Sequence, residues 1–425
     1  MQMVIQARTP TRRPAPGAPN SPGLRIRIAN AGQLAHALHE SREQLLSMFS
    51  GFEAALGTEG LAISFDPVLN LPLWELGHIG WFEEWWIRRN PERARGIQCG
   101  SALERLDSLL PGADRLYDSA NVAHATRWQL ALPKADATRA YLAQVREQTL
   151  ALLEKNAVSA HALYFFRLAL LHEDMHREAW FMMAQHLNID LGVDLPETCD
   201  GALQAEGEWE VPGGARDLGG DAEGFSFDNE LKAFAPFVGS FCMDRAPVTW
   251  RRYLPFLQAG GYDDAGLWTP EGWQWCQQHS DGMPLHTRFA DGEWQQRRFG
   301  HWRVLDQDTP AMHLSAHEAA AWCRFAGRRL PTEVEWESAA RLAAEQNEAF
   351  DWGRVWEWTA SAFAPYVGFA PHPYRDYSAP FFDGRPVLRG GSIATHARML
   401  HPAYRNYFAA DRRDVFAGFR SCAVS

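Results

Sequence analysis

The sequence lacks a surplus of positive charge, a long apolar run and a paired-cysteine motif. Its formal net charge is -11, which argues against nucleic-acid binding because neutralising phosphates needs an excess of Lys and Arg. It contains no window of about 18 uninterrupted apolar residues, the length that a membrane-spanning helix requires. Its 6 cysteines are scattered without a C-x-x-C pair, so neither a zinc knuckle nor a dense disulfide framework is expected. These absences predict a soluble protein of the reducing cytoplasm, with a small-molecule or protein partner.

Apolar character is also scarce at the start of the chain. Residues 1–24 hold five prolines and three arginines, and they lack the continuous apolar segment of a secretion signal. This composition predicts a disordered leader. With 425 residues, 46% of them hydrophobic, the chain is long enough for more than one core, and we expect two domains.

Helical periodicity dominates from about residue 29 to residue 191. Apolar residues recur there at three-, four- and seven-residue spacing, at Leu34, Leu38, Leu45 and Met48 and again at Leu142, Val145 and Leu152. Such spacing is typical of amphipathic helices, and we expect a four-helix bundle over residues 25–197. Pro196, Pro212 and paired glycines then break the pattern between residues 191 and 214, which predicts the domain boundary.

An irregular α+β domain is expected over residues 205–425, so the fold class is α plus α+β. Glycine, tryptophan and other aromatic residues crowd into short segments there, and only residues 315–327 and 331–344 read clearly as helices. In the second of these helices Thr332 is a plausible cap and Glu335 completes a capping box. The rest predicts loops and short strands, which often carry binding residues.

The sharpest local motif is H-E-x-x-H at residues 172–176, inside an apolar helical run. Histidines four residues apart share one face of a helix, so His172 and His176 can reach one ion. Taken alone, the motif is typical of zinc proteases, in which Glu173 would be the general base. The structural alternative is a pair of partly exposed helix histidines without a metal.

A third histidine, His78, lies in an aromatic segment, residues 73–86, that predicts a buried helix of the same bundle. Three imidazoles from two helices of a bundle are a known way to build a metal site with open positions. Metzincin proteases place their third ligand downstream of the motif, unlike His78. Imidazole suits zinc, copper, iron and nickel, so the ligands leave the metal open. Glu75, Glu173 and Asp174 either accept hydrogen bonds from the distal ring N–H groups or are solvated helix charges.

Six short strings follow one another in the second half: FDNE (227–230), DRAPVT (244–249), GRRLPTE (327–333), VWEWT (355–359), LRGGS (388–392) and FAGFR (416–420). Together with the three histidines they resemble the ergothioneine-type sulfoxide synthases. That family joins a DinB-like four-helix bundle to a formylglycine-generating-enzyme-like domain of the C-type-lectin-like kind. The resemblance covers nearly the whole chain after the leader. It implies that the second domain closes over the metal, so that the site lies between domains, where pockets are often found.

The resemblance also implies a cofactor and substrates. It places Fe(II) on His78, His172 and His176, with open positions for the imidazole of hercynine, a sulfur substrate and O2. By position, Arg127 and Arg412 resemble arginines that bind the carboxylate of the sulfur substrate.

Four further residues receive roles from the resemblance alone. Asn406 resembles an asparagine that binds hercynine. Tyr374 and Tyr377 look like a pair in which one tyrosine donates a proton or hydrogen atom to the reduced oxygen and the other lines the hercynine pocket. Tyr366 competes for these roles, because loop lengths differ within the family. Aromatic packing is the structural alternative for each tyrosine.

The string at Asn406, Tyr407 and Phe408 departs from the family pattern, which commonly reads Asn-Trp-Asp there. The aspartate that would meet the amino group of a cysteine-like substrate is therefore absent. An apolar ring cannot replace it, because an unpaired buried ammonium is costly. Cysteine or γ-glutamylcysteine is expected to bind poorly.

Other departures point the same way. Phe82 and Met175 stand near positions where the family often has glutamines that touch hercynine, and Ile393 replaces a tryptophan. The pattern is most similar to the selenoneine synthase branch, which joins hercynine to a selenosugar, 1-seleno-glucose, in an oxygen-dependent reaction. Arg127 and Arg412 would then bind sugar hydroxyls or support the pocket.

Other functions remain open at this point. The first alternative is a sulfoxide synthase that uses cysteine, γ-glutamylcysteine or another thiol. A formylglycine-generating enzyme would need a reactive cysteine pair, and only Cys422 stands near the appropriate C-terminal site. A non-catalytic, lectin-like binding protein would make the three histidines incidental. Trp74, Tyr407 and Phe408 either face the trimethylammonium of hercynine or pack in the core, and packing is favoured for Trp74.

Overall fold

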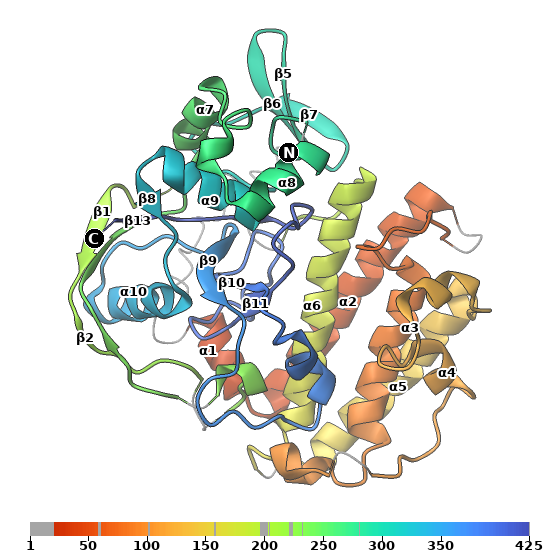
Figure 1. Ribbon diagram of the computed structural model, residues 1–425. Helices are drawn as coiled ribbons and strands as arrows, with labels where there is room; N and C mark the ends of the chain where they lie inside the picture. Colours follow the sequence, from red (N-terminus) through yellow and green to blue (C-terminus); the bar gives the residue numbers. More distant parts are fainter. Residues whose placement is uncertain are drawn as a thin grey trace, which may run out of the picture.

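The computed structural model describes residues 21–57, 61–100, 103–156, 159–195, 203, 205–220, 224–231, 233–279 and 281–424. Figure 1 shows a helical half on the right and a half of short strands and helices on the left. Residues 1–20 of the predicted leader lie outside the described residues. Helix α1 (Pro22–Arg27) begins before the predicted end of the leader, so the leader prediction was wrong for its last three residues. The reason is burial, since Ile26 joins the core and Arg27 binds both carboxylate oxygens of Glu230, at 2.6 and 2.8 Å.

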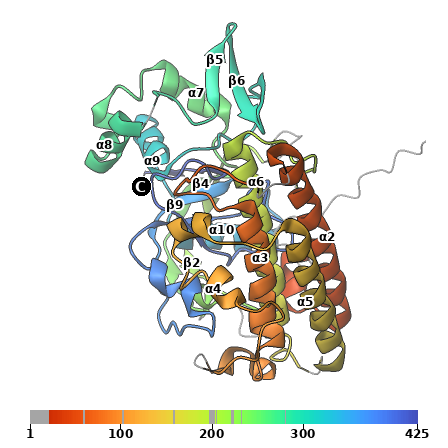
Figure 2. The same ribbon diagram turned by 90° about the vertical axis from the view of Figure 1, so that its right-hand side faces the viewer.

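Four long helices lie side by side in the first half, as Figures 1 and 2 show. They are α2 (Ala31–Leu56), α3 (Pro72–Glu83), α5 (Ala135–Asn156) and α6 (Tyr164–Leu187). Shorter elements connect α3 to α5, namely the π-helical turn η1 (Glu84–Arg88), the 3-10 helices η2 (Arg93–Gln98) and η3 (His124–Gln129), and α4 (Ala113–Tyr117). The predicted helical bundle is confirmed.

Two helices show why the sequence folds in this way. Helix α2 begins at a capping box formed by Asn30 and Gln33, and its predicted apolar stripe is buried at Leu34, Leu38, Leu45 and Met48. Helix α3 begins with Pro72, a residue suited to the first helical position. All 12 of its residues are buried, so α3 is the central helix of the bundle.

Four charged side chains meet inside the bundle, one from each long helix. Arg42 Nη2 lies 2.7 Å from Glu83 Oε2 and 2.9 Å from Glu173 Oε2. Arg146 binds the same two carboxylates, at 2.9 Å from Glu83 Oε1 and 2.7 Å from Glu173 Oε2. All four are buried, and each charge has its counter-charge, as burial requires.

Short strands form small sheets in the described part of the second half. One four-stranded sheet has the order β1 (Glu208–Val211), β4 (Phe241–Asp244), β13 (Cys422–Ala423) and β8 (Arg328–Arg329). A second has the order β11 (Asn406–Tyr407), β10 (Pro386–Arg389), β9 (Trp356–Ala362) and β12 (Ala417–Gly418), with β12 parallel to β9. Strands β2 (Gly214–Ala215) and β3 (Phe237–Val238) pair, and β5 (Thr287–Ala290), β6 (Glu293–Arg298) and β7 (His301–Val304) form the meander at the top of Figure 1.

Both helices predicted for the second half are present, as α9 (Ala316–Phe325) and α10 (Glu333–Gln346). Thr332 caps α10, and Glu335 completes the predicted capping box. Helices α7 (Trp250–Gln258) and α8 (Pro270–His279) were missed. Pro255 inside α7 normally argues against a helix, but four large buried side chains of α7 hold it in place. Short 3-10 turns complete the half, at η4 (Asp228–Glu230), η5 (Ala265–Leu267), η6 (Arg375–Tyr377) and η7 (Ala379–Phe381).

Helix α6 joins the two halves. Its Glu178 Oε1 accepts hydrogen bonds from Trp356 Nε1 at 2.7 Å, Ser392 Oγ at 2.8 Å and Thr395 Oγ1 at 2.7 Å. The predicted fold class, a helical region followed by an irregular α+β domain, is confirmed. The domain limits at residues 25–197 and 205–425 stay a prediction, because one hydrophobic cluster runs through both halves. Among the described helices none has the length and apolarity to cross a bilayer.

Candidate metal centre

Three histidines from two bundle helices converge on one point. His78 on α3 and His172 and His176 on α6 each offer a ring nitrogen, and these atoms lie within 4.8 Å of one another. The Nε2 atoms of His172 and His176 are 3.2 Å apart. This spacing fits imidazoles that surround one ion at nitrogen–metal distances of about 2.0–2.1 Å.

The opposite ring nitrogens of two of these histidines bind acceptors. His78 Nδ1 lies 2.8 Å from the carbonyl oxygen of Tyr117, and His176 Nδ1 lies 2.5 Å from Glu75 Oε1. With Nδ1 as donor, each ring keeps its Nε2 lone pair for a metal. Gly77 permits the first contact, since a Cβ at that position would lie 2.2 Å from the Tyr117 ring.

Burial keeps the imidazoles of His78 and His172 neutral. It lowers the pKa of His78 to about 3 and the pKa of His172 well below its ordinary value, and the neighbouring His176 adds to both shifts. The Phe82 ring stacks on His172 with 3.5 Å between centroids, and Trp74 stacks on His78 at 5.0 Å. Neutral rings held in fixed orientations are what metal binding needs.

The surroundings of the histidines fit a bound cation. Glu75 Oε2 is buried and has no hydrogen-bond partner among the described residues, and a cation on the histidines would compensate the charge of that carboxylate. Three imidazoles on one side of an ion would leave the opposite positions open for other ligands. This donor set suits iron as well as zinc, copper or nickel.

Glu173, the second residue of the H-E-x-x-H string, does not face the metal site. Its Oε2 lies between Arg42 and Arg146 in the bundle core, and only 1% of the side chain is exposed. A carboxylate held there cannot act as general base on a metal-bound water, so the zinc-protease interpretation is wrong. Asp174 also pairs with arginines, which leaves Glu75 as the one acceptor among the three candidates that contacts a histidine.

A cavity of about 780 Å³ opens between the two halves beside His172 and His176. Helix α6 forms one wall and loops of the second half form the other. Most of the residues that the sequence predicted to bind substrate or react line this cavity, namely Arg127, Met175, Tyr374, Tyr377, Asn406, Tyr407, Phe408 and Arg412. The structure therefore brings these residues together with two of the three metal histidines, while His78 lies behind them.

Phe82, which was expected near hercynine, occupies a different place. It packs flat on His172 and lines a neighbouring cavity of about 250 Å³. Tyr374 meets the Phe82 ring edge-on with 5.0 Å between centroids. Phe82 therefore fixes the orientation of a metal ligand rather than lining the larger cavity.

The two predicted arginines differ in how their charge is compensated. Arg127 Nη1 donates to Asn70 Oδ1 at 2.6 Å, its guanidinium lies 3.9 Å from the centroid of Trp74, and its Nε is buried without a partner among the described residues. Arg412 donates to both oxygens of Asp414, at 2.5 and 2.6 Å. Arg127 thus has no carboxylate hydrogen-bonded to it, although the nearby Glu75 partly compensates its charge, whereas Arg412 is directly paired with Asp414.

Tyr374 and Tyr377 both line the cavity, and burial raises the pKa of each above its ordinary value. Both phenols are therefore protonated at neutral pH. The Tyr377 hydroxyl lies 3.8 Å from Met175 Sδ, one residue before a metal ligand. Tyr407 donates its hydroxyl to the Tyr377 carbonyl oxygen, and Asn406 Oδ1 accepts from the Tyr407 amide at 2.8 Å.

Tyr366, the competing tyrosine, lies elsewhere. Its hydroxyl donates to Glu333 Oε2 at 3.3 Å, and the Arg405 guanidinium covers its ring at 4.1 Å. It does not line the cavity beside the histidines. Its contacts are those of a packing residue.

Sequence reasoning missed several residues of the site, among them Asn70, Tyr117, Asp376 and Arg385. Tyr117 acts through its backbone carbonyl, for which no side-chain pattern exists. Asn70, Asp376 and Arg385 come from loops that meet only in the folded chain, and Arg385 is paired with Asp383 at 2.6 Å.

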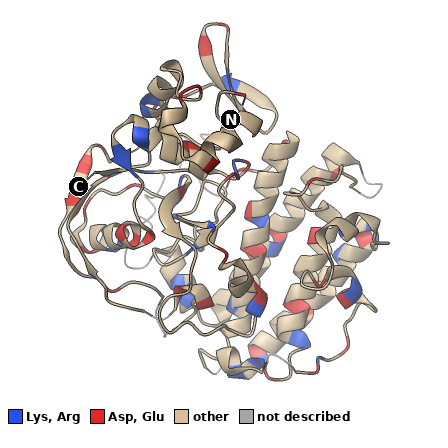
Figure 3. Cartoon of the chain, viewed as in Figure 1, with Lys and Arg blue, Asp and Glu red and all other residues tan. Residues whose placement is uncertain are grey.

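Charges of both signs are interspersed along the helices and loops, and the view of Figure 3 shows no continuous basic stripe. This distribution agrees with the net charge of -11. A basic stripe is what phosphate backbones require, so the cavity remains the candidate site.

Comparisons with known proteins agree with this two-part architecture. The sulfatase-modifying factor enzyme 1-like domain matches residues 196–354 and 351–424, which confirms the expected formylglycine-generating-enzyme-like domain. The hercynine oxygenase of Mycolicibacterium smegmatis is 34% identical over 91% of this chain and 97% of its own length. That of Mycobacterium tuberculosis is 32% identical over 91% and 98%. The chain belongs to the hercynine oxygenase family.

A more distant relative covers the second half alone. The formylglycine-generating enzyme of Streptomyces coelicolor is 28% identical over 51% of this chain and 88% of its own length. Cys422, the cysteine nearest to the expected position, is fully buried on β13 and unpaired, and burial raises its pKa to about 12. A thiol in this environment is inert, which argues against formylglycine chemistry here.

Replacing His176 with alanine should abolish metal binding, because only two imidazoles remain. His186, ten residues further along the same helix, pairs with Asp66 at 3.2 Å and is not one of the three clustered histidines, so His186→Ala is the matched control. Metal content per chain, measured by inductively coupled plasma mass spectrometry after iron loading, should fall for His176→Ala alone. Equal metal content in both variants would mean that the histidines are incidental, as in a lectin-like binding protein.

Glu75→Gln should weaken metal binding by about 10- to 100-fold, because the acceptor of His176 Nδ1 loses its charge. Glu173→Gln is the same isosteric change at the carboxylate that follows His172 in the chain. It should lower the free energy of unfolding, because Glu173 pairs with Arg42 and Arg146, but leave metal affinity unchanged. Titration with a competing chelator measures the first quantity and urea denaturation the second. A larger metal defect in Glu173→Gln would contradict this assignment.

Proposed function

We propose that this protein catalyses the oxygen-dependent attachment of a chalcogen atom to the imidazole ring of hercynine, with Fe(II) as cofactor. The observation that carries the proposal is the three-histidine centre at the wall of a cavity that two buried tyrosines also line. Similarity to enzymes named hercynine oxygenases supports hercynine as substrate, and iron as the metal is what the family resemblance implies.

His78, His172 and His176 would hold the iron through Nε2. Once bound, iron supplies open positions at which the chalcogen donor, the hercynine imidazole and O2 meet. Glu75 and the Tyr117 carbonyl keep the ligating rings in the tautomer that exposes Nε2. The packing of Phe82 on His172 keeps water from that face of the ring.

The overall reaction balances without an added reductant. The donor loses the hydrogen on its sulfur or selenium, and the imidazole loses the hydrogen on the carbon that is attacked. A carbon–chalcogen bond forms, one atom of O2 remains on the chalcogen as an oxide, and the other leaves as water with both hydrogens.

Tyr377 is the proposed proton donor to the reduced oxygen, and Tyr374 lines the hercynine side. The Tyr377 hydroxyl lies beside Met175, next to His176 in the chain. The raised pKa of this buried phenol keeps its proton in place until it is needed. The Tyr407 hydroxyl, which donates to the Tyr377 backbone, holds that segment in position.

For the donor we propose a selenosugar, 1-seleno-glucose. Phe408 lines the cavity where the resemblance leads one to expect an aspartate, and Arg412 is already paired with Asp414. Neither residue is therefore available to the ammonium and carboxylate of an amino-acid thiol. A sugar carries neither charge, and its hydroxyls match Asn70, Arg127 and Asn406.

A sulfur donor is the second candidate. The similarity to hercynine oxygenases supports an ergothioneine-type sulfoxide synthase, with cysteine or γ-glutamylcysteine as donor, more directly than it supports selenium. Arg127 has no carboxylate hydrogen-bonded to it and keeps a buried Nε without a partner among the described residues, which suits one carboxylate of the donor. The two candidates share the metal centre and differ only in the donor.

Aerobic incubation of the iron-loaded protein with hercynine and each donor in turn separates these candidates. We expect a product with 1-seleno-glucose and little or none with cysteine or γ-glutamylcysteine, because their ammonium finds no counter-ion beside Phe408. Products are followed by mass spectrometry, and 1-thio-glucose reports whether the enzyme selects the sugar or the chalcogen. Turnover with cysteine but not with the selenosugar would overturn the selenium assignment and keep the iron site. No product with any donor would overturn the function.

Tyr377→Phe should lower kcat by about 100- to 10,000-fold, the range for loss of a general acid, with KM for hercynine little changed. Tyr374→Phe should raise KM more than it lowers kcat. Tyr366→Phe is the control, because that hydroxyl lies outside the cavity. Steady-state kinetics of the three variants distinguish these roles, and a near-normal kcat for Tyr377→Phe would remove it as the donor.

A further inference from the structure

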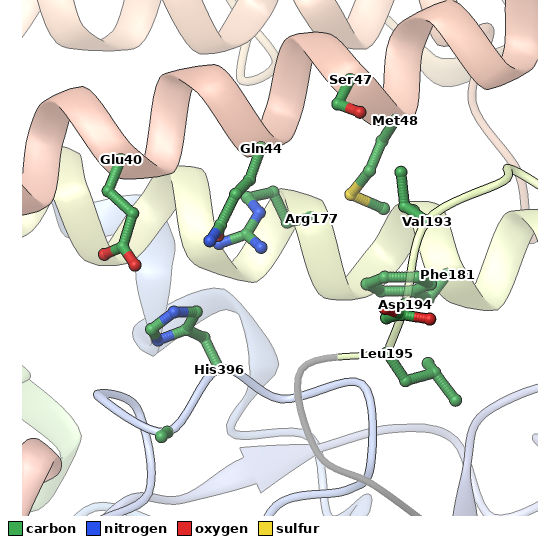
Figure 4. Close-up of a pocket in the computed structure, with 11 residues that line it drawn as sticks. Glu40, Gln44, Ser47, Met48, Arg177, Phe181, Val193, Asp194, Leu195 and His396 are labelled. Atoms are coloured by element: carbon green, nitrogen blue, oxygen red, sulfur yellow. The ribbon is translucent and has the colours of Figure 1, made fainter. Parts of the chain in front are cut away.

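A second cavity lies against a different face of helix α6 from the one that carries His172 and His176. Its volume is about 340 Å³, and it is bounded by α2, α6, residues 193–195 and the turn at His396. Arg177 and Phe181 on α6 line it, and each follows a metal histidine by five residues, a rotation of about 140° around the helix. Figure 4 shows these residues, with α2 above the cavity and α6 behind it.

One end of this cavity is polar. Glu40 and Gln44 from α2, Arg177 from α6 and His396 from the second half gather there (Figure 4). Arg177 is 5% exposed, and its Nη1 pairs with Asp174 Oδ1 at 3.1 Å, but its Nε is buried without a partner among the described residues. Gln44 Oε1 is likewise buried and without a partner in the described part of the chain. An unmet buried donor and an unmet buried acceptor each carry a free-energy cost, which a bound polar group would remove.

The other end is apolar. Met48, Phe181, Val193 and Leu195 line it (Figure 4), and Asp194 stands at its exposed rim. The cavity lies near the lower limit of the volumes that small-molecule sites have, about 300–1,000 Å³. It therefore suits a ligand with a compact polar head and an apolar tail of a few carbon atoms.

The charges of the polar end decide the chemistry of the head. A simple anion could bind Arg177, whose positive charge Asp174 already shares, but it would also lie near the negative charge of Glu40. A simple cation could bind Glu40, but it would also lie near the positive charge of Arg177. Glu40 keeps part of its negative charge free, because its side chain is 43% exposed and Arg398 touches it from one side at 3.2 Å. A polar head with a positive and a negative charge on neighbouring groups can pair with both Glu40 and Arg177.

We propose that this cavity is a binding site for a free α-amino acid with an apolar side chain, of the size of leucine or methionine. The carboxylate binds Arg177, the ammonium binds Gln44 Oε1 and Glu40, and the side chain lies among Met48, Phe181 and the chain at 193–195. The site is separate from the metal cavity and does not depend on the function proposed above.

Such a ligand touches three elements at once. It contacts α2, the metal-bearing helix α6, and the turn after Thr395, which Glu178 holds against α6. A ligand that binds only this closed arrangement stabilises it by mass action. Occupancy should therefore raise the melting temperature of the full-length protein and slow separation of the two halves.

Isothermal titration calorimetry on the full-length iron-loaded protein tests the proposal. L-Leucine and L-methionine are the probes, with 4-methylpentanoate, which lacks the ammonium, and isoamylamine, which lacks the carboxylate. We expect saturable binding of the amino acids and at least about tenfold weaker binding of each analogue, since each loses a charge-assisted contact. Absence of amino-acid binding, or equal binding of the analogues, would overturn the proposal.

Three variants locate the site. Leu195→Trp fills the apolar end from a loop and should abolish leucine binding. Glu40→Gln should weaken it about tenfold, whereas Glu43→Gln, the same change at a position of α2 that does not line the cavity, should not. Unchanged leucine binding in both Leu195→Trp and Glu40→Gln would assign the ligand to another place and overturn the proposal. Hercynine turnover is measured in parallel, so that loss of leucine binding with catalysis intact, or the reverse, separates this site from the catalytic one.

Discussion

The side-chain oxygen Oε1 of Glu178 holds helix α6, which carries His172 and His176, against the second half. Glu178 Oε1 accepts hydrogen bonds from Trp356, Ser392 and Thr395, and no basic group shares in these bonds. Trp356 and Ser392 stand in two of the sequence strings that define the second half. Residues of those strings therefore also bind helix α6, which carries His172 and His176, two of the candidate metal ligands. Together with the Asp174–Arg398 ion pair and the hydrogen bond from Gln185 to the Arg297 carbonyl oxygen, this contact joins α6 to the second half.

The bundle uses buried charge in a similar way, but with full ion pairs. Arg42, Arg146, Glu83 and Glu173 connect all four long helices, and removing one member of such a cluster typically costs about 3–5 kcal/mol. The glutamate of the H-E-x-x-H string thus stabilises the fold, while His172 and His176 of the same string could hold a metal ion. One short motif therefore divides its residues between two faces of a helix, and only one of those faces points to the candidate site.

Helical periodicity and histidine spacing were sufficient to predict the bundle and the convergence of His78, His172 and His176. The prediction failed where backbone atoms or long-range packing decide. Tyr117 reaches His78 through a carbonyl, Phe82 lies on a metal ligand although its position suggested substrate contact, and Pro255 concealed a helix. The pairing of Arg412 with Asp414 could not be foreseen either, because a charge two residues away in sequence becomes a partner only when the loop is folded. Side-chain patterns report buried faces, but they do not report which groups finally pair.

The division of labour between the halves has a consequence for how this protein can diversify. All three candidate metal ligands, and the acceptors of His78 and His176, belong to the helical half, whereas Asn406, Tyr407, Phe408 and Arg412 belong to one loop region of the second half. Changes in that region alter what the cavity accepts without disturbing the metal. Substitutions in a single segment of about nine residues could therefore change which donor the cavity accepts. A laboratory library confined to residues 404–412 would sample such changes while the three histidines stay the same.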